Sequence, residues 1–400
     1  MSRSASVREN PRLTLEHLLS SPEVARALHS LETNAEAITD QHLRIASVPA
    51  GPFNEHERAE YLRQKFLELR LTEVEIDEEG NCLGLIEGAS RSPLIVISAH
   101  LDTVFSKDTD FKVIEHDGRF FAPGIADDSS GLTALIALAQ AIQNERIAIE
   151  GSILFVGTVG EEGEGNLRGV RHLFTKGRWA ARVDAFVSFD GPGVDRITHR
   201  ALGSRRYRVD FVGPGGHSWG DFGLPNPVHA MGRAISRLAA YPAPKEPRTT
   251  FNVGRIEGGT SVNAIPSKAW MEVDLRSSAE SELRRLDAFF RRAMKDAADE
   301  ENAKIKLELI GERPTGETPS DSLLVELAIE ATKMLGFEPR LDQASTDSNL
   351  PISLGIPAIT LGAGGASGNS HTLDEWYDPR DRDKGLKRGL LVALGMVKIS

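Results

Sequence analysis

Short apolar runs rich in β-branched residues recur in the first half of this chain, and they constrain its fold more than any other feature. The runs are TEVEID, GNCLGLIEG, SPLIVISAH, GSILFVGTVG and DAFVSFDG. A strongly helical segment, GLTALIALAQAIQ, lies between them, and Ser129 and Ser130 just before it are N-cap candidates. Strands that are apolar on both faces and alternate with helices predict an α/β fold: a mostly parallel sheet with helices on both faces.

The pattern of predicted elements changes near residue 201 and again near residue 314. Between these positions the order is strand, helix, strand, strand, helix, strand, which is the ferredoxin-like βαββαβ order. The α/β pattern then resumes with a helix around SDSLLVELAIEATKML and the strand IPAITLG. We therefore predict one α/β domain, residues 1–200 and 314–400, interrupted by a small inserted domain, residues 201–313. Residues 12–70 are predicted to be helical.

The composition argues against several classes of protein. The 400 residues include 47 basic and 58 acidic ones, so the formal net charge is −11. A net anion lacks the positive surface that nucleic acids and anionic membranes attract, and neither is expected as a partner. No apolar run approaches the roughly 20 residues that cross a bilayer, and the N-terminus lacks a signal-peptide core. The single cysteine, Cys82, forms no internal disulfide, so we expect a cytoplasmic protein.

Histidines and acidic residues stand at the ends of the predicted strands of the α/β domain. Ligands bind beyond the carboxyl ends of the strands in an open α/β sheet, so these side chains are expected at one site. Two imidazoles with several carboxylates suit a pair of divalent cations, zinc first, with manganese or cobalt as substitutes. The residues concerned are His100, Asp102, Asp127, Asp128, Glu161, Glu162, Asp190 and His371.

The number of carboxylates at these strand ends also predicts cations. Asp127, Glu162 and Asp190 would repel one another if they met without positive charge. Two dications would more than neutralise these three side chains and would leave a site that binds an anionic hydroxide. Coordination lowers the pKa of a bound water to about 7, so a nucleophile exists at neutral pH.

Two further carboxylates have predicted roles beside the metal. Adjacent side chains in an extended chain point to opposite sides, so Glu161 and Glu162 are not expected to bind the same ion. One of them binds metal, and the other acts as a general base that moves a proton from water to the leaving amine. Asp102 is placed to accept the second N–H of His100, while Asp128 is interpreted as turn and capping chemistry.

Seven segments, in the same order along the chain, carry a resemblance to a known family. They are SAHLDTV, APGIADDSSG, GTVGEEGEGNLRG, SFDGPG, GPGGHS, SVNAIPSKAWMEVDLRS and GNSHTLDEW. The chain resembles the co-catalytic di-zinc metallohydrolases that include peptidase T, carboxypeptidase G, aminoacylase and succinyl-diaminopimelate desuccinylase. The DDSSG and STDSN segments look most like the peptidase T-like branch.

This resemblance implies two zinc ions and an amide-bond hydrolase. His100, Asp127 and Asp190 would bind one ion. Asp127, Glu162 and His371 would bind the other, so that Asp127 bridges the pair. Glu161 would be the general base, and the peptide bond after Asp127 would be cis.

The resemblance also implies a role for the inserted domain, as a lid that forms a homodimer and contacts the substrate. His217 in GPGGHS would polarise the oxygen of the scissile carbonyl. Asn263 and Arg276 would hold a substrate carboxylate or carbonyl. A salt bridge within the lid is the alternative role of Arg276. Residues 346–349, TDSN, would border the substrate pocket.

Several functions remain open at this point. The first is a zinc-dependent hydrolase of short peptides, a di- or tripeptidase or exopeptidase, with metal-bound hydroxide as nucleophile. An N-acyl-amino-acid deacylase or desuccinylase of the same family is the alternative. A lidless di-zinc aminopeptidase has a similar ligand order, but the helices and strands predicted between Asp190 and His371 argue against it. A non-catalytic binding protein that keeps a hydrolase fold is a more remote alternative, which a lack of bound metal would favour.

Overall fold

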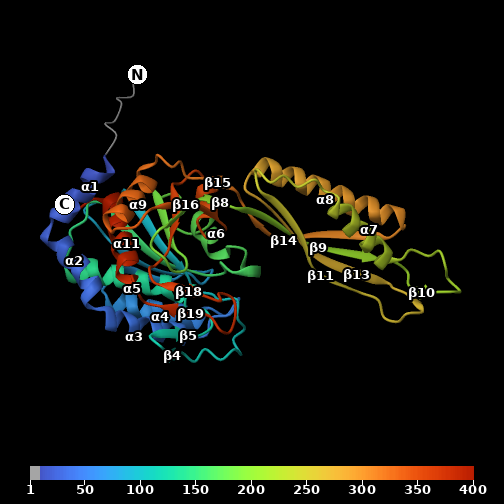
Figure 1. Cartoon of the computed structure of the whole chain (residues 1–400), viewed down its shortest axis with the longest axis horizontal. Coiled ribbons are helices and arrows are strands. Elements are labelled where there is room, and N and C mark those ends of the chain that lie inside the picture. The colour runs from blue at the N-terminus through green and yellow to red at the C-terminus, as the bar shows by residue number, and fades with distance from the viewer. Residues whose placement is uncertain (1–9) are drawn as a thin grey trace, which may run out of the picture. The chain divides into compact units, whose positions relative to one another are not determined.

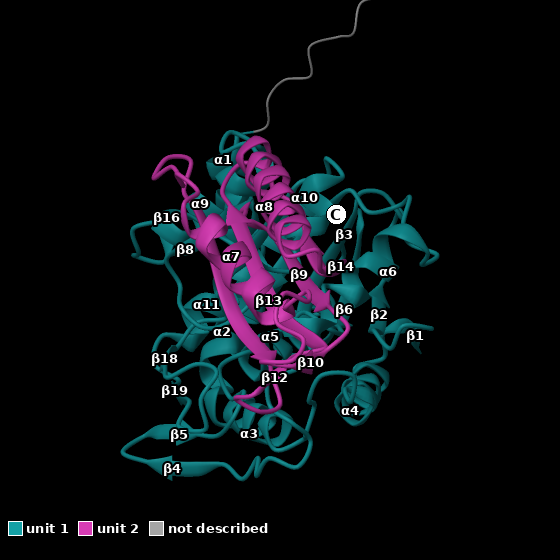
Figure 2. Ribbon diagram, turned by 90° about the vertical axis from the view of Figure 1, so that its right-hand side faces the viewer, with its two compact units in different colours: residues 1–200, 317–400 teal, residues 201–316 magenta. Residues whose placement is uncertain are grey.

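A computed structural model describes residues 10–400 of the chain (Figure 1). The chain forms two compact units, coloured separately in Figure 2. The large unit comprises the chain up to Arg200 together with Glu317–Ser400, and the small unit is Ala201–Gly316. Each unit is described by itself below.

The helices of the large unit begin close to its N-terminus. They are α1 (Pro11–Ser20), α2 (Pro22–Thr33), α3 (Ala35–Ala46), α4 (His56–Glu68), α5 (Ser129–Asn144), α6 (Arg168–Thr175), α9 (Leu323–Met334), α10 (Asn349–Ser353) and α11 (Arg382–Val397), with a 3-10 turn η1 (Gly163–Gly165). The first four confirm the helical prediction for residues 12–70. None of the helices that the structure describes combines the length and the apolar character needed to cross a bilayer.

The predicted N-cap of α5 is wrong. The cap is Asp128, whose carboxylate accepts the N–H of Gly131 at 3.0 Å. The hydroxyls of Ser129 and Ser130 lie inside the first turn and donate to the carbonyls of Gly124 and Ala126. Asp128 thus provides the capping that the sequence analysis interpreted for it, in place of the two serines.

The main sheet of the large unit has nine strands. They are β1 (Thr72–Ile76), β2 (Cys82–Ile86), β3 (Leu94–His100), β6 (Ser152–Thr158), β7 (Ala185–Phe189), β8 (Arg196–Ala201), β15 (Gly316–Glu317), β16 (Arg340–Ala344) and β17 (Ala358–Leu361). Their order is β1-β2-β6-β3-β7-β17-β8-β15, with β16 paired to β8.

The pairing corrects the prediction of a mostly parallel sheet. The central strands β6, β3, β7 and β17 are parallel to one another. The pairs β1 with β2, β2 with β6, and β17 with β8 are antiparallel. The sheet is therefore mixed, since helical crossovers connect its centre whereas β1 and β2 form a hairpin.

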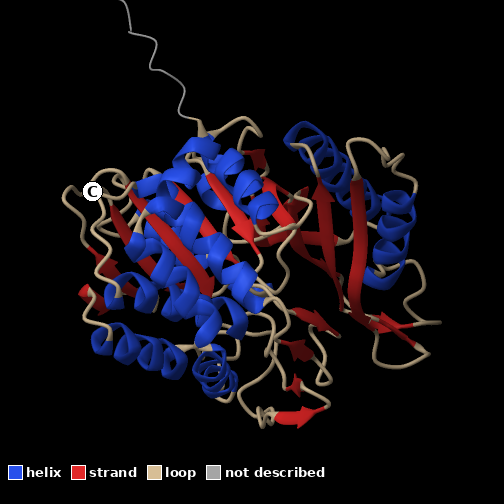
Figure 3. Cartoon of the chain, turned by 60° about the vertical axis from the view of Figure 1, so that its left-hand side comes forward, coloured by secondary structure: helices blue, strands red, loops and turns tan. Residues whose placement is uncertain are grey.

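Helices cover both faces of this sheet, as predicted (Figure 3). Ile97, Phe155 and Val187 share one register row and belong to the core cluster that includes residues of α5 and α11. Phe186, one position earlier on β7, points to the opposite face. Its ring lies 5.7 Å from that of Phe174 on α6.

A second, four-stranded sheet of the large unit has the order β18-β19-β5-β4. Its strands are β4 (Ile114–His116), β5 (Arg119–Phe121), β18 (Ala366–Gly368) and β19 (Trp376–Asp378). This sheet joins the segment before Asp127 to the segment around His371, so it brings two distant parts of the chain together.

The small unit has the predicted ferredoxin-like order. Its main elements are β9 (Gly203–Val212), α7 (Pro227–Ala239), β11 (Thr249–Gly258), β13 (Lys268–Ser277), α8 (Glu280–Glu300) and β14 (Lys304–Arg313), and a short ladder pairs β10 (Gly216–His217) with β12 (Ala264–Ile265). The four long strands form an antiparallel sheet in the order β11-β13-β9-β14. Helices α7 and α8 pack on one face, where Tyr207 and Phe290 stack 4.9 Å apart.

Helix α3 contacts the loop before α5 through a buried histidine. The Nε2 atom of His42 lies 2.6 Å from the carbonyl oxygen of Ile125, so Nε2 carries the proton of the neutral ring. The same ring packs edge-on against Tyr377, with centroids 4.5 Å apart. Burial lowers the pKa of His42 from 6.5 to about 4.

We expect the substitution His42→Gln to make the protein less sensitive to acid. The unfolded chain binds a proton at His42 below pH 6.5, whereas the folded chain binds it only near pH 4. The stabilisation is therefore complete above pH 6.5, and up to about 3 kcal/mol is lost as the pH falls through this window. Glutamine still donates to Ile125 but does not titrate. Urea unfolding of both proteins across the window measures the difference, and two parallel curves would contradict this role of His42.

Candidate metal centre

Asp127 lies between the two histidines of the predicted site. His100 Nε2 is 2.8 Å from Asp127 Oδ1, and His371 Nε2 is 3.2 Å from Asp127 Oδ2. His371 Nε2 is also 2.9 Å from Oε1 of Glu162. Ligand atoms of His100, Asp127 and Glu162 all lie within 4.8 Å of one another. The large unit thus brings four of the five predicted ligand residues into one cluster.

The fifth residue, Asp190, follows β7 at the same edge of the sheet. Its N–H donates to the carbonyl of Leu361, at the end of β17, at 3.0 Å. Burial and the negative charge of Asp127 raise the pKa of Asp190 to about 6. The negative charges of Asp127 and Asp190 therefore interact at this edge of the sheet.

The two imidazoles compensate part of this negative charge. Although burial acts in the opposite direction, hydrogen bonds with His100 and His371 hold the pKa of Asp127 well below its usual range. Hydrogen bonds with Asp127 and Glu162 raise the pKa of His371 to about 10. The contacts between ring nitrogens and carboxylate oxygens mark the positions where cations would bind.

Divalent cations fit this set of donors. The imidazole nitrogens face carboxylate oxygens at hydrogen-bond distance, and a cation would bind through the lone pairs of the same atoms. Two ring nitrogens and three carboxylates are mixed nitrogen and oxygen ligands, which zinc, manganese and cobalt accept. The peptide bond between Asp127 and Asp128 is cis, as the resemblance implies.

Asp128 has a larger role than the turn chemistry predicted for it. Its buried carboxylate accepts the N–H groups of His100 at 3.1 Å, Gly131 at 3.0 Å and Gly191 at 3.2 Å. These groups belong to the end of β3, the first turn of α5 and the loop after β7. Asp128 therefore fixes the backbone of His100 and of the residue after Asp190 relative to α5.

Glu375 is a second supporting carboxylate, which the sequence analysis missed. It is fully buried and accepts the N–H groups of Gly124 at 3.2 Å, Ala126 at 2.8 Å and Asp127 at 3.0 Å. Burial raises its pKa to about 7. The only available signal was its position four residues after His371, within a segment quoted for the resemblance.

The predicted contact of Asp102 is wrong in its detail. His100 Nδ1 lies 3.0 Å from the backbone carbonyl of Asp102 but 3.7 Å from its carboxylate. The two carboxylate oxygens instead accept the N–H groups of Glu161 at 3.0 Å and Glu162 at 2.8 Å. The backbone carbonyl thus orients the imidazole, and the side chain of Asp102 positions the two glutamates.

The residues predicted to bind substrate lie in the small unit. His217 and Asn263 are exposed neighbours, because β10 pairs with β12 and the N–H of Ser218 donates to the carbonyl of Asn263. His217 Nδ1 accepts the N–H groups of Trp219 and Gly220, at 3.1 and 3.3 Å.

Arg276 stands apart from these two residues, on β13. Its Nε lies 2.6 Å from Oδ2 of Asp274, in an ion pair on the same strand. This contact is the salt bridge that the sequence analysis gave as the alternative role of Arg276.

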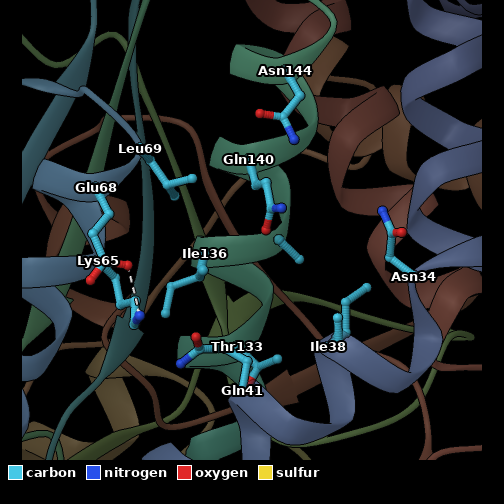
Figure 4. A pocket seen from close by; sticks show the side chains of 12 residues that line it. Asn34, Ile38, Gln41, Lys65, Glu68, Leu69, Thr133, Ile136, Gln140 and Asn144 are labelled. Atoms are coloured by element: carbon cyan, nitrogen blue, oxygen red, sulfur yellow. Dashed lines mark hydrogen bonds and ion pairs between the residues drawn. The ribbon is translucent and has the colours of Figure 1, made fainter.

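A groove between α3, α4 and α5 is separate from this cluster (Figure 4). Its volume is about 500 Å³, and its lining includes the carboxamides of Asn34, Gln140 and Asn144 and the ion pair of Lys65 with Glu68. None of the predicted site residues lines it, so this groove is not the metal centre.

Comparisons with known proteins agree with the fold. The model of peptidase family M20/M25/M40 matches residues 96–394. A succinyl-diaminopimelate desuccinylase of Nitrosospira multiformis is 24% identical over 313 residues, which cover 74% of this chain and 81% of that protein.

Solved structures of low sequence identity show the same fold. Aminopeptidase PepT of Bacillus cereus matches with a TM-score of 0.75 and 22% identity, over 91% of this chain and 99% of that one. The YXEP protein of Bacillus subtilis, described as a dinuclear metal binding peptidase, matches with a TM-score of 0.69 and 18% identity, over 92% of this chain and 100% of that one. Since the family model spans well over half of the sequence, the chain belongs to peptidase family M20/M25/M40.

Proposed function

We propose that this protein hydrolyses the amide bonds of short peptides, as a di- or tripeptidase or exopeptidase that depends on two zinc ions. The observation that carries the proposal is the contact of both imidazoles with the two oxygens of Asp127. A single carboxylate between two nitrogen donors is suited to bridging two ions. PepT of Bacillus cereus and a tripeptidase of Staphylococcus aureus share the fold and support a peptide substrate.

The proposed ligands follow from the cluster. His100, Asp127 and Asp190 would hold one ion, and Asp127, Glu162 and His371 the other. When bound, the ions supply Lewis-acid chemistry, because they acidify water at neutral pH and polarise a carbonyl oxygen. Cobalt or manganese would substitute for zinc, since the donors are nitrogen and oxygen.

Glu161 is proposed as the general base. It takes a proton from the attacking water as the oxygen of that water bonds to the carbonyl carbon, and it gives the proton to the nitrogen as the C–N bond breaks. Its side chain is buried, which excludes most bulk water from the transfer. Asp102 holds the N–H groups of Glu161 and Glu162, so it orients the base and the neighbouring ligand together.

The small unit is proposed as a lid that contacts the substrate and joins two copies of the chain in a homodimer. His217 Nδ1 accepts two backbone N–H groups, so the neutral ring carries its proton on Nε2. This proton would be donated to the carbonyl oxygen as negative charge develops there. Asn263 and Arg276 would hold a carboxylate or carbonyl group of the substrate. We assign the protein to the cytoplasm, where its single cysteine would stay reduced.

Removal of an acyl group from an amino acid is the second candidate function. The observation that favours it is the similarity to succinyl-diaminopimelate desuccinylases, which extends over 74% of this chain. Such an enzyme could use the same metal ligands and the same general base, and it would differ in the groups that bind the acyl chain.

A substrate panel combined with metal exchange tests the proposal. Zinc-loaded protein should hydrolyse di- and tripeptides faster than N-acetyl and N-succinyl amino acids. A chelator should abolish turnover, and zinc, cobalt or manganese should restore it. The opposite substrate preference would select the deacylase. If the protein binds no metal and turns over none of these compounds after reconstitution, it is a non-catalytic binding protein.

A further inference from the structure

Residues 346–349, TDSN, are buried in the large unit just before and at the start of α10. Thr346, Asp347, Ser348 and Asn349 each expose at most 3% of their surface. The resemblance implies that they border the substrate pocket. In the structure they are buried and form hydrogen bonds with residues at the ends of two strands. A buried run of four polar residues needs hydrogen-bond partners, and these partners suggest what the segment does.

The first partner is the end of β6. Thr158, the last residue of that strand, donates its hydroxyl to Asp347 Oδ2 at 2.5 Å, and both residues are buried. Its one proton goes to this closer acceptor rather than to the carbonyl of Ala99 at 3.2 Å. Thr158 stands opposite His100 in the β3–β6 register, and its carbonyl accepts the N–H of Leu101.

The second partner is the end of β17. The hydroxyls of Thr346 and Ser348 lie 2.8 and 2.7 Å from Oγ1 of Thr360. The next residue, Leu361, accepts the N–H of Asp190 with its carbonyl. The segment is therefore bonded to β17 beside the residue that holds Asp190.

We propose that residues 346–348 form a clamp that positions the metal ligands. The clamp joins the end of β6, which leads into Glu161 and Glu162, to the end of β17, which holds Asp190. Metal sites require ligands placed within about 0.5 Å, so a fixed distance between these two strand ends matters for affinity. The inference rests on the proposed metal centre, and it makes Asp347 and Thr158 positioning residues that act through the backbone of the ligands.

Zinc titration of the metal-free protein, without substrate, tests the clamp. Thr158→Val keeps the shape of the side chain but removes the hydroxyl that Asp347 binds. We expect it to weaken zinc affinity about 10- to 100-fold, as is usual when the partners of metal ligands are changed. Thr158→Ser keeps the hydroxyl and should restore affinity close to that of the natural protein. Asp347→Ala removes the acceptor of the Thr158 hydroxyl and should weaken affinity in the same direction.

Thr198→Val is the matched control. Thr198 lies on β8 in register with Thr360, is buried, and its hydroxyl has no hydrogen-bond partner among residues 10–400. The same substitution on the same sheet should leave zinc affinity unchanged. Thermal unfolding of each metal-free variant then separates loss of affinity from loss of fold.

The outcomes distinguish the clamp from the metal centre. Equal zinc affinity in Thr158→Val, Thr158→Ser and the natural protein would overturn the clamp. If Thr158→Val does not fold, Asp347→Ala decides, because alanine leaves no acceptor for the Thr158 hydroxyl, and unchanged zinc affinity in that variant would overturn the clamp. Failure of the natural protein to bind zinc would instead overturn the proposed metal centre.

Discussion

Replacement of Asp127 by alanine is expected to remove both bound ions and to lower kcat/KM by at least about 1000-fold, since bound metals contribute several kcal/mol to the transition state. Asp127 is the carboxylate that contacts both His100 and His371. Without it His100 Nε2 loses its carboxylate partner, and His371 keeps only Glu162. Elemental analysis of the purified variant gives the metal content, and peptide hydrolysis gives the rate.

The control for this prediction is Asp108→Ala. Asp108 is an exposed carboxylate of the same unit, in the loop that follows Asp102. This variant should retain both ions and the activity of the natural protein. If Asp127→Ala kept two ions per chain, the bridging role of Asp127 would be wrong.

Glu161→Gln is expected to give a protein that binds both ions but turns over substrate about 10²- to 10⁴-fold more slowly, the usual contribution of a general base. Glutamine keeps the size of the side chain, and its backbone N–H still donates to Asp102. The loss should appear in kcat, with little change in KM, because a proton transfer acts only in the transition state.

Substitutions of two neighbouring glutamates provide comparisons for the Glu161→Gln variant. Glu162→Gln should lose metal as well as activity, because Glu162 contacts His371 and belongs to the ligand cluster. Glu164→Gln, an exposed position in the turn that follows, should resemble the natural protein. A Glu161→Gln variant with unchanged kcat would remove Glu161 from the mechanism.

Most of the fold was predictable because its signals are local. The apolar runs that become β3, β6 and β7 have the composition of strands buried on both faces, and the structure confirms them. The antiparallel outer strands were not predicted, because the pairing of β2 with β6 joins segments separated by about 70 residues. No local pattern specifies with which strand another strand pairs, or whether the pairing is parallel or antiparallel.

The candidate site, like the fold, was only partly predictable from the sequence. Histidines and acidic residues at strand ends identified the cluster, since the chemistry of a ligand is a property of its residue type. The partners of those ligands were missed or misassigned. Asp102 binds the two glutamates rather than His100, and Glu375 binds backbone groups up to 251 residues away in the sequence.

The sequence by itself determined the types of elements, the inserted ferredoxin-like unit and the residues with metal-binding chemistry. Only the tertiary structure decided which carboxylates support those residues and through which atoms. The physical reason is that a hydrogen bond requires its two atoms to lie about 3 Å apart. Such distances between remote segments are set by the packing of the whole unit, as the contact of Asp347 with Thr158 illustrates.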